Sequence, residues 1–364
     1  MSGTSLDGVD GVLCDFSESA PTLQTRAHVA LPFADEFKQE LLALNSPGAN
    51  ELHRAALAAN QLARVYAQVV QQLLTQTNTS PQQVQAIGAH GQTVRHQPQV
   101  HDGTGYTLQL NNPALLAELT GIAVVADFRS RDVAAGGQGA PLVPAFHAEV
   151  FATPQETTAV LNLGGIANLT LITPSSSTLG FDCGPGNALM DHWCQLHTGA
   201  AFDRNGTWAA SGEVITPLLN AWQQEPFFQK SPPKSTGRDL FNPTWLAPHL
   251  ALANGARPQD VQASLTELTA WSCAQALKAH GDQGVKRLLV CGGGALNGEL
   301  MRRLQTHLPD IRVVSSEEAG LPPLQVEAVA FAWLARQTWL GRSSNLPAVT
   351  GALGPRVLGA IYPA

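Results

Sequence analysis

The sequence has little charge, and lysine is especially scarce. Charged residues make up 13% of the 364 residues, about half of the ~25% of an average globular protein, and only five residues are lysines. Acidic residues outnumber basic ones by 28 to 21, for a formal net charge of −7. Nucleic-acid binding needs clustered lysine and arginine, so we expect no nucleic-acid partner. Because 44% of the residues are hydrophobic, the low charge does not indicate disorder.

Cysteine is also scarce, and its spacing excludes two classes of small domain. The five cysteines are Cys14, Cys183, Cys194, Cys273 and Cys291. No pair has CxxC spacing, which argues against a disulfide framework and a zinc ribbon. No run approaches the ~18 apolar residues of a membrane helix, and the amino end lacks the basic head and apolar stretch of a signal peptide. We therefore expect a cytoplasmic protein with no membrane partner.

Several catalytic motifs are missing. The sequence has no Gly-Lys dipeptide, and hence no P-loop, and it lacks the VAIK, HRD and DFG set of protein kinases. The HExxH and GxSxG motifs are missing too. These absences exclude four large classes of enzyme.

Strand-like and helix-like patterns alternate along the chain, which is typical of an α/β protein. The chain length suggests two domains. We expect a boundary near residue 130, giving domains over 1–130 and 131–364, because the segment Arg129–Pro144 is rich in turn residues. The main strands are expected over Val9–Phe16, Ala86–Ala89, Thr107–Leu110, Ile122–Ala126, Ala159–Leu163, Ile166–Ile172, Leu179–Phe181, Arg287–Val290 and Ile311–Val314. The main helices are expected over Pro32–Leu44, Glu51–Gln76, Val261–Ala279, Asn297–Leu308 and Leu324–Leu340, with others starting near Pro113 and Asn187.

Glycine and aspartate recur in loops next to the expected strands. The first such loop runs from Gly3 to Asp10, where backbone N–H groups and small hydroxyls can surround a phosphate and a neighbouring carboxylate can hold Mg²⁺. An ordinary tight turn is the alternative. Gly164-Gly165 joins two expected strands as a hairpin, the commonest such connection. Asp182 ends a strand before the turn Gly184-Pro185-Gly186, where it either faces a ligand or caps the turn.

A third glycine loop supports two different functions. Gly292, Gly293 and Gly294 lie between an expected strand and helix, as in a nucleotide-binding loop. The same unit resembles a dinucleotide-binding βαβ motif, and a nicotinamide-dependent oxidoreductase is therefore the alternative function. The GxGxxG pattern fails, however, because Asn297 stands at its third glycine. A sugar-binding module without catalysis is a third class, since the polar segment His90–His96 suits a sugar as well as a plain loop.

Six of these segments occur together and in order, and together they resemble the anhydro-N-acetylmuramic acid kinases. They are Met1–Asp10, Gly88–His96, Asp127–Arg129, Leu163–Asn168, Phe181–Asn187 and Cys291–Gly294. The resemblance spans nearly the whole chain. It implies the actin/hexokinase/Hsp70 fold, in which two α/β, ribonuclease H-like domains flank an ATP cleft.

The resemblance also implies a role for each segment. Asp182 is the expected general base, and Asp7 is the expected ligand of Mg²⁺. The residues expected to bind ATP are Gly3, Thr4, Ser5, Leu6, Asp7, Gly8, Val9, Asp10, Gly164, Gly165, Asn168, Gly292, Gly293 and Gly294. The residues expected to contact the sugar are Gln92, Thr93, Arg131 and Glu327.

The implied reaction couples hydrolysis to phosphoryl transfer. Asp182 deprotonates a water that opens the 1,6-anhydro bridge of the sugar, and the released O6 attacks the γ-phosphate of ATP. The products are N-acetylmuramic acid 6-phosphate and ADP, in the recycling of cell-wall fragments. We expect the enzyme to act on this small molecule as a homodimer.

One departure from the family concerns the amino end. Members of this family usually begin with a short strand before Met-Ser-Gly, whereas this sequence begins at Met1 of that motif. We expect the first strand to be missing here, and its restoration to stabilise the protein.

Overall fold

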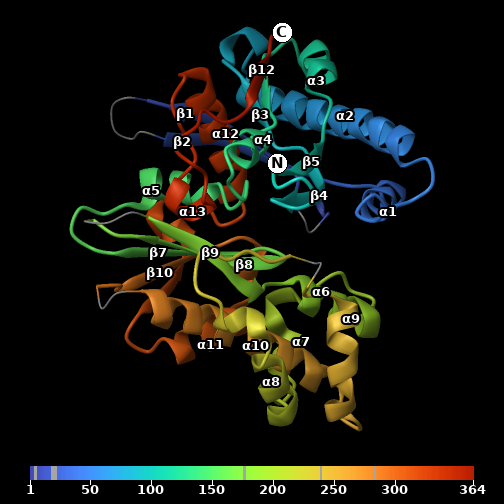
Figure 1. The fold of residues 1–364 in the computed structure, drawn as a ribbon, viewed down its shortest axis with the longest axis vertical. Helices are drawn as coiled ribbons and strands as arrows, with labels where there is room; N and C mark the ends of the chain where they lie inside the picture. Colours follow the sequence, from blue (N-terminus) through green and yellow to red (C-terminus); the bar gives the residue numbers. More distant parts are fainter. Residues whose placement is uncertain (4–5, 18–22, 175–177, 238–239, 282–283) are drawn as a thin grey trace. The chain divides into compact units, whose positions relative to one another are not determined.

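The computed structural model describes residues 1–3, 6–17, 23–174, 178–237, 240–281 and 284–364. The chain forms two compact units (Figure 1). Unit 1 comprises Met1–Phe146 and Gln325–Ala364, and unit 2 comprises His147–Leu324. Each unit contains both strands and helices, which confirms the α/β prediction.

The division into units differs from the expected boundary at residue 130. Residues 131–146 and 325–364 belong to unit 1. The last strand, β12 (Ala360–Tyr362), pairs antiparallel with β6 (Val124–Ala126), and helix α12 (Val326–Trp339) packs against β3 and β6. These contacts join segments more than 200 residues apart, so a search for turn-rich linkers does not detect them.

Unit 2 is built on a five-stranded sheet with the order β11-β10-β7-β8-β9. Strands β7, β8 and β9 run antiparallel in succession, whereas β10 is parallel to β7 and β11 is parallel to β10. This is the arrangement expected of a ribonuclease H-like domain. The bounds are β7 (Thr158–Leu163), β8 (Ile166–Ile172), β9 (Leu179–Pro185), β10 (Arg287–Cys291) and β11 (Arg312–Ser315).

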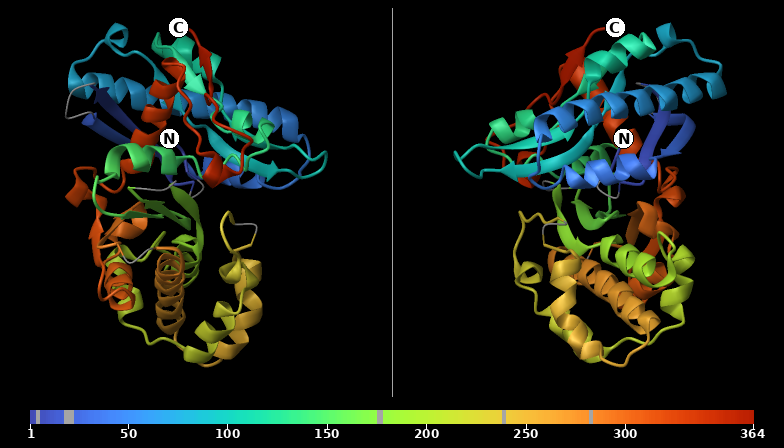
Figure 2. Two further views of the ribbon diagram at one scale, coloured as in Figure 1. Left: turned by 60° about the vertical axis from the view of Figure 1, so that its left-hand side comes forward. Right: turned by 90° about the vertical axis from the view of Figure 1, so that its right-hand side faces the viewer.

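Helices cover the unit 2 sheet, whose central strand is buried along its whole length. All six residues of β7 are buried, as in a strand covered on both faces. Helix α10 (Pro258–His280) packs against β8 and β9, and α11 (Gly298–His307) packs against α10 and β11 (Figure 2). The other α-helices of this unit are α6 (Ala188–Thr198), α7 (Thr207–Ala210), α8 (Thr216–Gln223) and α9 (Pro243–Leu246).

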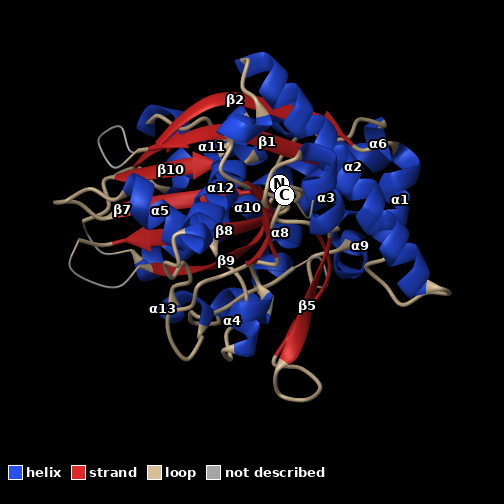
Figure 3. Ribbon diagram, turned by 90° about the horizontal axis from the view of Figure 1, so that it is seen from above, coloured by secondary structure: helices blue, strands red, loops and turns tan. Residues whose placement is uncertain are grey.

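Unit 1 contains three small groups of strands. β1 (Gly8–Phe16) pairs with β2 (Leu23–Pro32), and β4 (Gln92–Pro98) pairs with β5 (Gly105–Leu110). The β4–β5 ribbon pairs with no other described strand of unit 1 (Figure 3). The third group has the order β12-β6-β3, with β3 at Ile87–Ala89.

The helices of unit 1 follow from amphipathic patterns and caps. The long helix α2 (Glu51–Thr77) buries one stripe that includes Leu62, Tyr66 and Leu73. Asn112 caps α3 by accepting a hydrogen bond from the N–H of Leu115 at 3.0 Å, as its position before Pro113 suggests. The remaining helices are α1 (Asp35–Ala43), α3 (Pro113–Thr120), α4 (Ser130–Ala134) and α13 (Pro347–Thr350), while α5 (Val143–Phe151) crosses the division between the units.

Most expected elements are confirmed, but three strands, β2, β4 and β12, were missed. The expected helix over Pro32–Leu44 is wrong at its start, because the chain stays in β2 to Pro32 and α1 begins at Asp35. The segment His90–His96 was expected to be a loop, yet most of it lies in β4.

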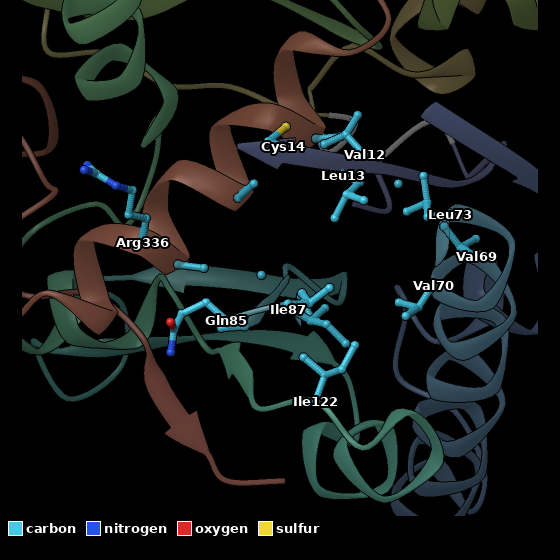
Figure 4. A pocket seen from close by; sticks show the side chains of 18 of the residues that line it. Val12, Leu13, Cys14, Val69, Val70, Leu73, Gln85, Ile87, Ile122 and Arg336 are labelled. Carbon is cyan, nitrogen blue, oxygen red and sulfur yellow. The ribbon is translucent and has the colours of Figure 1, made fainter. Parts of the chain in front are cut away.

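Unit 1 also holds a cavity of about 760 Å³ between β1 and β3 (Figure 4). Val12, Leu13 and Cys14 of β1 line one side, and Ile87 of β3 lines the opposite side. Helices α2 and α12 supply further lining side chains. Exposed residues, among them Asp15, Gln85 and Leu340, also line it, so the cavity opens at the surface of unit 1.

Candidate active site

Unit 2 brings three glycine-containing turns to one edge of its sheet. β7 and β10 are parallel, so both end at this edge. β8 is antiparallel to β7 and β9, so β9 ends at the same edge. Gly164-Gly165 and Gly292–Gly294 follow the ends of β7 and β10, and Gly184–Asn187 spans the end of β9.

The first two turns are hydrogen-bonded to each other. The N–H groups of Gly186 and Ala188 donate to the carbonyl of Gly165 at 3.0 and 3.2 Å, and the N–H of Asn187 donates to that of Gly164 at 2.8 Å. A Cβ atom on Gly186 would lie 2.3 Å from the Gly164 oxygen. Glycine is therefore required for the close approach of these two backbones.

The third turn packs against the first. Gly292 has a φ of 78°, and a Cβ there would lie 2.7 Å from the carbonyl oxygen of Leu163. A Cβ on Gly294 would lie 2.5 Å from the Cβ of Leu163. The sequence placed these glycines in separate loops, and the structure brings them together as one cluster, in which Gly293 is exposed, Gly164 and Gly292 are half-buried, and Gly165, Gly186 and Gly294 are buried.

Asp182 lies on β9, close to the end of that strand. Its side chain is half-buried, and its carboxylate Oδ2 accepts a hydrogen bond from the N–H of Thr236 at 2.9 Å. The N–H of Asp182 donates to the carbonyl of Lys234 at 3.1 Å. The segment Lys234–Thr236 therefore holds both the backbone and the carboxylate of Asp182.

The sequence did not predict a role for this segment. Burial lowers the pKa of Lys234, and attraction to Cys183 and Asp182 opposes that shift. The signal that could have found it is that Lys234 is one of only five lysines in the chain.

Asn168, expected to bind ATP, lies directly across from Asp182. The two residues pair in the β8–β9 ladder, where β9 carries one extra residue, Cys183. Such bulges are common next to active sites because they redirect side chains.

The first loop of unit 1 is partly described. Thr4 and Ser5 lie outside the described residues. Leu6 and Val9 are only 3% and 2% exposed, so any contact with a ligand must come from their backbone. Leu6 has a φ of 59°, which is uncommon for a branched side chain and marks a sharp reversal of the chain. A Cβ on Gly8 would lie 2.1 Å from the Leu31 carbonyl oxygen, so Gly8 is needed for packing against β2.

The acidic residues of this loop differ in their surroundings. Asp7 is exposed, whereas the Asp10 carboxylate lies 3.1 Å from Nε2 of His28. Among the described residues, no group of three or more His, Cys, Asp or Glu side chains is placed to hold a metal ion. Mg²⁺ commonly binds through one or two carboxylates together with substrate phosphates, so the exposed Asp7 fits such a site.

His90 contacts the amino-terminal segment and is itself held by Arg129. Nε2 of His90 accepts a hydrogen bond from Nε of Arg129 at 3.1 Å, and its Nδ1 lies 3.2 Å from the carbonyl of Ser2. Burial and the adjacent Arg129 hold the pKa of His90 well below its usual value. His90 is therefore neutral, with its proton on Nδ1 donated to Ser2.

Gln92 makes contacts that differ from those expected of a residue that binds the sugar. It is 1% exposed, accepts a hydrogen bond from the Ser2 hydroxyl, and donates to the Gly3 carbonyl at 3.1 Å. Both ends of its amide thus hold the first loop. Thr93 is half-buried and accepts a hydrogen bond from Gln109 at 3.2 Å.

The two other residues expected to contact the sugar lie on helices of unit 1. Arg131 is exposed on α4, next to the fully buried Asp132. Asp132 accepts hydrogen bonds from the N–H of Gly139, the Asn345 amide and the Thr350 hydroxyl at 2.7 to 2.8 Å. Glu327 is half-buried in the first turn of α12, and its charge acts on the amino group of Met1.

Comparison with known proteins decides the family. The model of one family, described as anhydro-N-acetylmuramic acid kinase, matches residues 1–364. The chain belongs to the anhydro-N-acetylmuramic acid kinase family. Proteins with that name are 63% identical in Variovorax paradoxus and 61% identical in Albidiferax ferrireducens, in each case over 100% of this chain and 98% of the relative. The name of the family agrees with the resemblance noted in the sequence, and nothing supports the oxidoreductase alternative.

Solved structures outside this kinase family are more distant. A component of (R)-2-hydroxyglutaryl-CoA dehydratase from Acidaminococcus fermentans is 11% identical over 90% of this chain and 99% of its own, with a TM-score of 0.44. A ROK family glucokinase from Streptomyces griseus, solved with glucose and AMPPNP, is 12% identical over 86% of this chain and 93% of its own, with a TM-score of 0.36. Within the described residues, none of the helices has the length and apolar character needed to cross a membrane.

Proposed function

We propose that this chain is an ATP-dependent kinase that opens 1,6-anhydro-N-acetylmuramic acid and phosphorylates O6. The products are N-acetylmuramic acid 6-phosphate and ADP. The observation that carries the proposal is the half-buried Asp182, held by the N–H of Thr236 in the same unit as the clustered glycine turns. Membership of the kinase family supports the substrate assignment.

Asp182 acts as the general base in this reaction. It takes a proton from a water whose oxygen bonds to the anomeric carbon, and the bond between that carbon and O6 breaks. O6 then bonds to the γ-phosphorus of ATP, and ADP leaves. A positioned carboxylate base contributes ~10²–10⁴ to a rate of this kind. The hydrogen bond from Thr236 fixes the carboxylate without neutralising it, because a backbone amide is uncharged.

The nucleotide is assigned to backbone-rich turns. We assign the β- and γ-phosphates to Gly3–Asp10 and to Gly164, Gly165 and Asn168, and the adenosine to Gly292–Gly294. Exposed backbone N–H groups of glycine turns bind phosphate oxygens without a side chain in the way. When bound, Mg²⁺ neutralises charge on the transferring phosphate, and Asp7 is the residue assigned to hold it.

The sugar is assigned to Gln92, Thr93, Arg131 and Glu327. Arg131 is exposed and suits an anionic group such as a carboxylate. Gln92 is better placed to support the loop of Gly3 than to contact the sugar directly, because its amide is engaged by Ser2 and Gly3.

The cellular setting is also part of the proposal. The use of ATP and five cysteines without a disulfide favour the cytoplasm, where thiols stay reduced. There the enzyme recycles cell-wall fragments, and we propose that it does so as a homodimer. Light scattering that gives the mass of one chain would contradict the dimer and leave the reaction untouched.

The experiment that tests the reaction is product analysis in ¹⁸O-enriched water. The protein is incubated with the anhydrosugar, ATP and Mg²⁺, and the product is analysed by mass spectrometry. We expect a phosphorylated sugar with one heavy oxygen at the anomeric carbon. A phosphorylated sugar with an intact anhydro bridge would mean an ordinary sugar kinase, and binding without ATP consumption would mean a sugar-binding module.

Asp182→Asn tests the role of the base. Asparagine keeps the shape and can still accept the hydrogen bond from Thr236, so the fold should persist while the rate falls by about 10²–10⁴. Glu156→Gln is the matched control, since Glu156 is an exposed carboxylate of the same unit. Equal rates in the two variants would remove Asp182 from the mechanism.

A further inference from the structure

The segment Lys234–Thr236 runs beside Asp182 and contacts it twice. The Lys234 carbonyl accepts a hydrogen bond from the N–H of Asp182 at 3.1 Å, and the Thr236 N–H donates to the carboxylate at 2.9 Å. The first contact fixes the position of the segment along β9. The second fixes the rotation of the carboxylate.

β9 lies at the end of the strand order in its sheet. An edge strand presents unpaired N–H and C=O groups, and the Lys234 carbonyl pairs with the N–H of Asp182 there. The side chain of Lys234 makes further contacts. Its Nζ lies 4.8 Å from the ring centre of Phe227 and 5.8 Å from that of Phe181, and 3.5 Å from the carbonyl oxygen of Phe227.

The ammonium group of Lys234 is directed toward the core. Phe181 is fully buried and Phe227 is 2% exposed, so the rings that it contacts belong to the interior of unit 2. Phe181 and Asp182 are consecutive in β9, and consecutive side chains of a strand point to opposite faces. Lys234 therefore anchors on the face of the sheet opposite to the Asp182 carboxylate, where it does not compete with a substrate for that carboxylate.

The chemistry of this anchor suits a lysine. An ammonium over two aromatic rings is attracted by their negative faces, and the attraction grows when water is excluded. Burial lowers the pKa of Lys234, but attraction to Cys183 and Asp182 opposes the shift. A neutral side chain of similar length would fill the same space without the attraction.

We propose that Lys234 is a positioning residue for Asp182. Its ammonium, held by Phe227 and Phe181, fixes the segment whose Thr236 N–H orients the carboxylate. This proposal rests on the role of Asp182 in the proposed function. A lysine with a purely structural role would stabilise the unit without affecting that hydrogen bond.

The first test needs no substrate. Hydrogen exchange of the Thr236 amide is measured in the unaltered protein, Lys234→Met, Lys234→Arg and the control Lys278→Met, which changes an exposed lysine of α10. We expect the Thr236 amide to exchange at least tenfold faster in K234M and at nearly the original rate in K234R and K278M. Unchanged exchange in K234M would overturn the proposal, even if the protein had no kinase activity.

The second test is kinetic and uses the same variants. Displacing a catalytic group by about 1 Å lowers the rate by up to ~10²-fold. We therefore expect K234M to lower kcat by about ten- to a hundredfold and to leave the KM for ATP and the KM for the sugar within about twofold of their original values. K234R should recover most of kcat. In the Asp182→Asn background K234M should have almost no further effect, because the two changes act on the same group. The same fold-loss in both backgrounds would overturn the proposal, whereas an unaffected Asp182→Asn variant would overturn the proposed base instead.

Discussion

Asn168 on β8 pairs with Asp182 on β9 across the antiparallel ladder, where the extra residue Cys183 interrupts the register. Opposed residues in such a ladder have their Cβ atoms about 4.5–5.5 Å apart. The neutral amide of Asn168 is therefore the cross-strand neighbour of the proposed base. A charge at this position would act on Asp182 directly.

Asn168→Asp should move the acid limb of the pH–rate profile to higher pH. Two carboxylates at this distance cannot easily both ionise, so one of them holds its proton to a higher pH. At neutral pH we expect a drop in kcat of at least about tenfold and a destabilisation of about 0.2–1 kcal/mol. Asn168→Thr is the neutral control. An identical pH profile in both variants would mean that Asn168 does not influence Asp182 through charge.

Gly292→Ala should destabilise the protein more than Gly199→Ala. Both residues have positive φ, 78° and 75°, so both variants carry the backbone strain of about 1–2 kcal/mol. A Cβ on Gly199 meets no atom within 4 Å, whereas a Cβ on Gly292 meets Asn162 at 2.6 Å and Leu163 at 2.7 Å. We expect G292A to lose at least about 1 kcal/mol more in urea unfolding, and to bind ATP more weakly. Equal losses would show that the Gly292 turn has room to relax.

The sequence predicted the local features of unit 2 well. The two apolar runs around Gly164-Gly165 form the expected hairpin, and the helix expected after Asn187 is α6. These features depend on periodicity and turn residues that are close together in the chain. Strand β2 also had a local signal, an alternation of Leu23, Thr25, Ala27, Val29 and Leu31 with polar or exposed residues, but it was overlooked.

Other features depend on contacts between distant segments and had no such signal. The engagement of Gln92 by Ser2 and Gly3 joins residues about 90 positions apart. The hydrogen bonds of Asp182 with Lys234 and Thr236 join residues more than 50 positions apart. Motif resemblance identified Asp182 and the glycine turns as important, but only the structure places the groups that orient them.

Acidification should destabilise unit 2 through His147. Burial lowers the pKa of His147 to about 3, so the folded protein keeps it neutral while the unfolded chain binds a proton below about pH 6.5. The contribution of the neutral His147 to the free energy of unfolding is therefore complete above about pH 6.5. It is lost as the pH falls toward 3, at about 1.4 kcal/mol per pH unit. Between pH 7 and 5 the free energy of unfolding, measured with urea, should fall by about 2 kcal/mol less in His147→Asn than in the unaltered protein. His53→Asn, at an exposed position, is the control, and equal slopes in both variants would contradict this account.

Gln92→Leu should weaken ATP binding more than sugar binding. The change removes the hydrogen bonds to Ser2 and Gly3 while keeping an uncharged side chain in a buried site. We expect a loss of about 1–3 kcal/mol in stability and about a tenfold rise in the KM for ATP. Gln24→Leu, at an exposed position of β2, is the control. A rise confined to the KM of the sugar would instead support the direct contact that the resemblance implies.

An apolar extension at the amino end should stabilise unit 1 by filling the cavity between β1 and β3. Among the described strands, β1 pairs with β2 alone and β3 with β6 alone, so each has an open edge toward the cavity. The Met1 amino group donates to the Asp10 carbonyl at 2.7 Å, and the Asp10 N–H donates back to Met1 at 2.9 Å, as in an antiparallel ladder. Burial lowers the pKa of this amino group to about 6, and an amide in its place would avoid burying a charge.

The test compares two eight-residue extensions of Met1, one of valine, isoleucine and tyrosine and one of serine and glycine. Because N–H groups alternate along a strand, those of Val12 and Cys14 face the same side as that of Asp10, and a new strand would protect them from exchange. We expect the apolar extension to raise Tm by about 5 °C or more and to slow exchange at Val12 and Cys14, and the polar one to do neither. Equal melting temperatures and exchange rates for the two extensions would show that this cavity does not receive a strand.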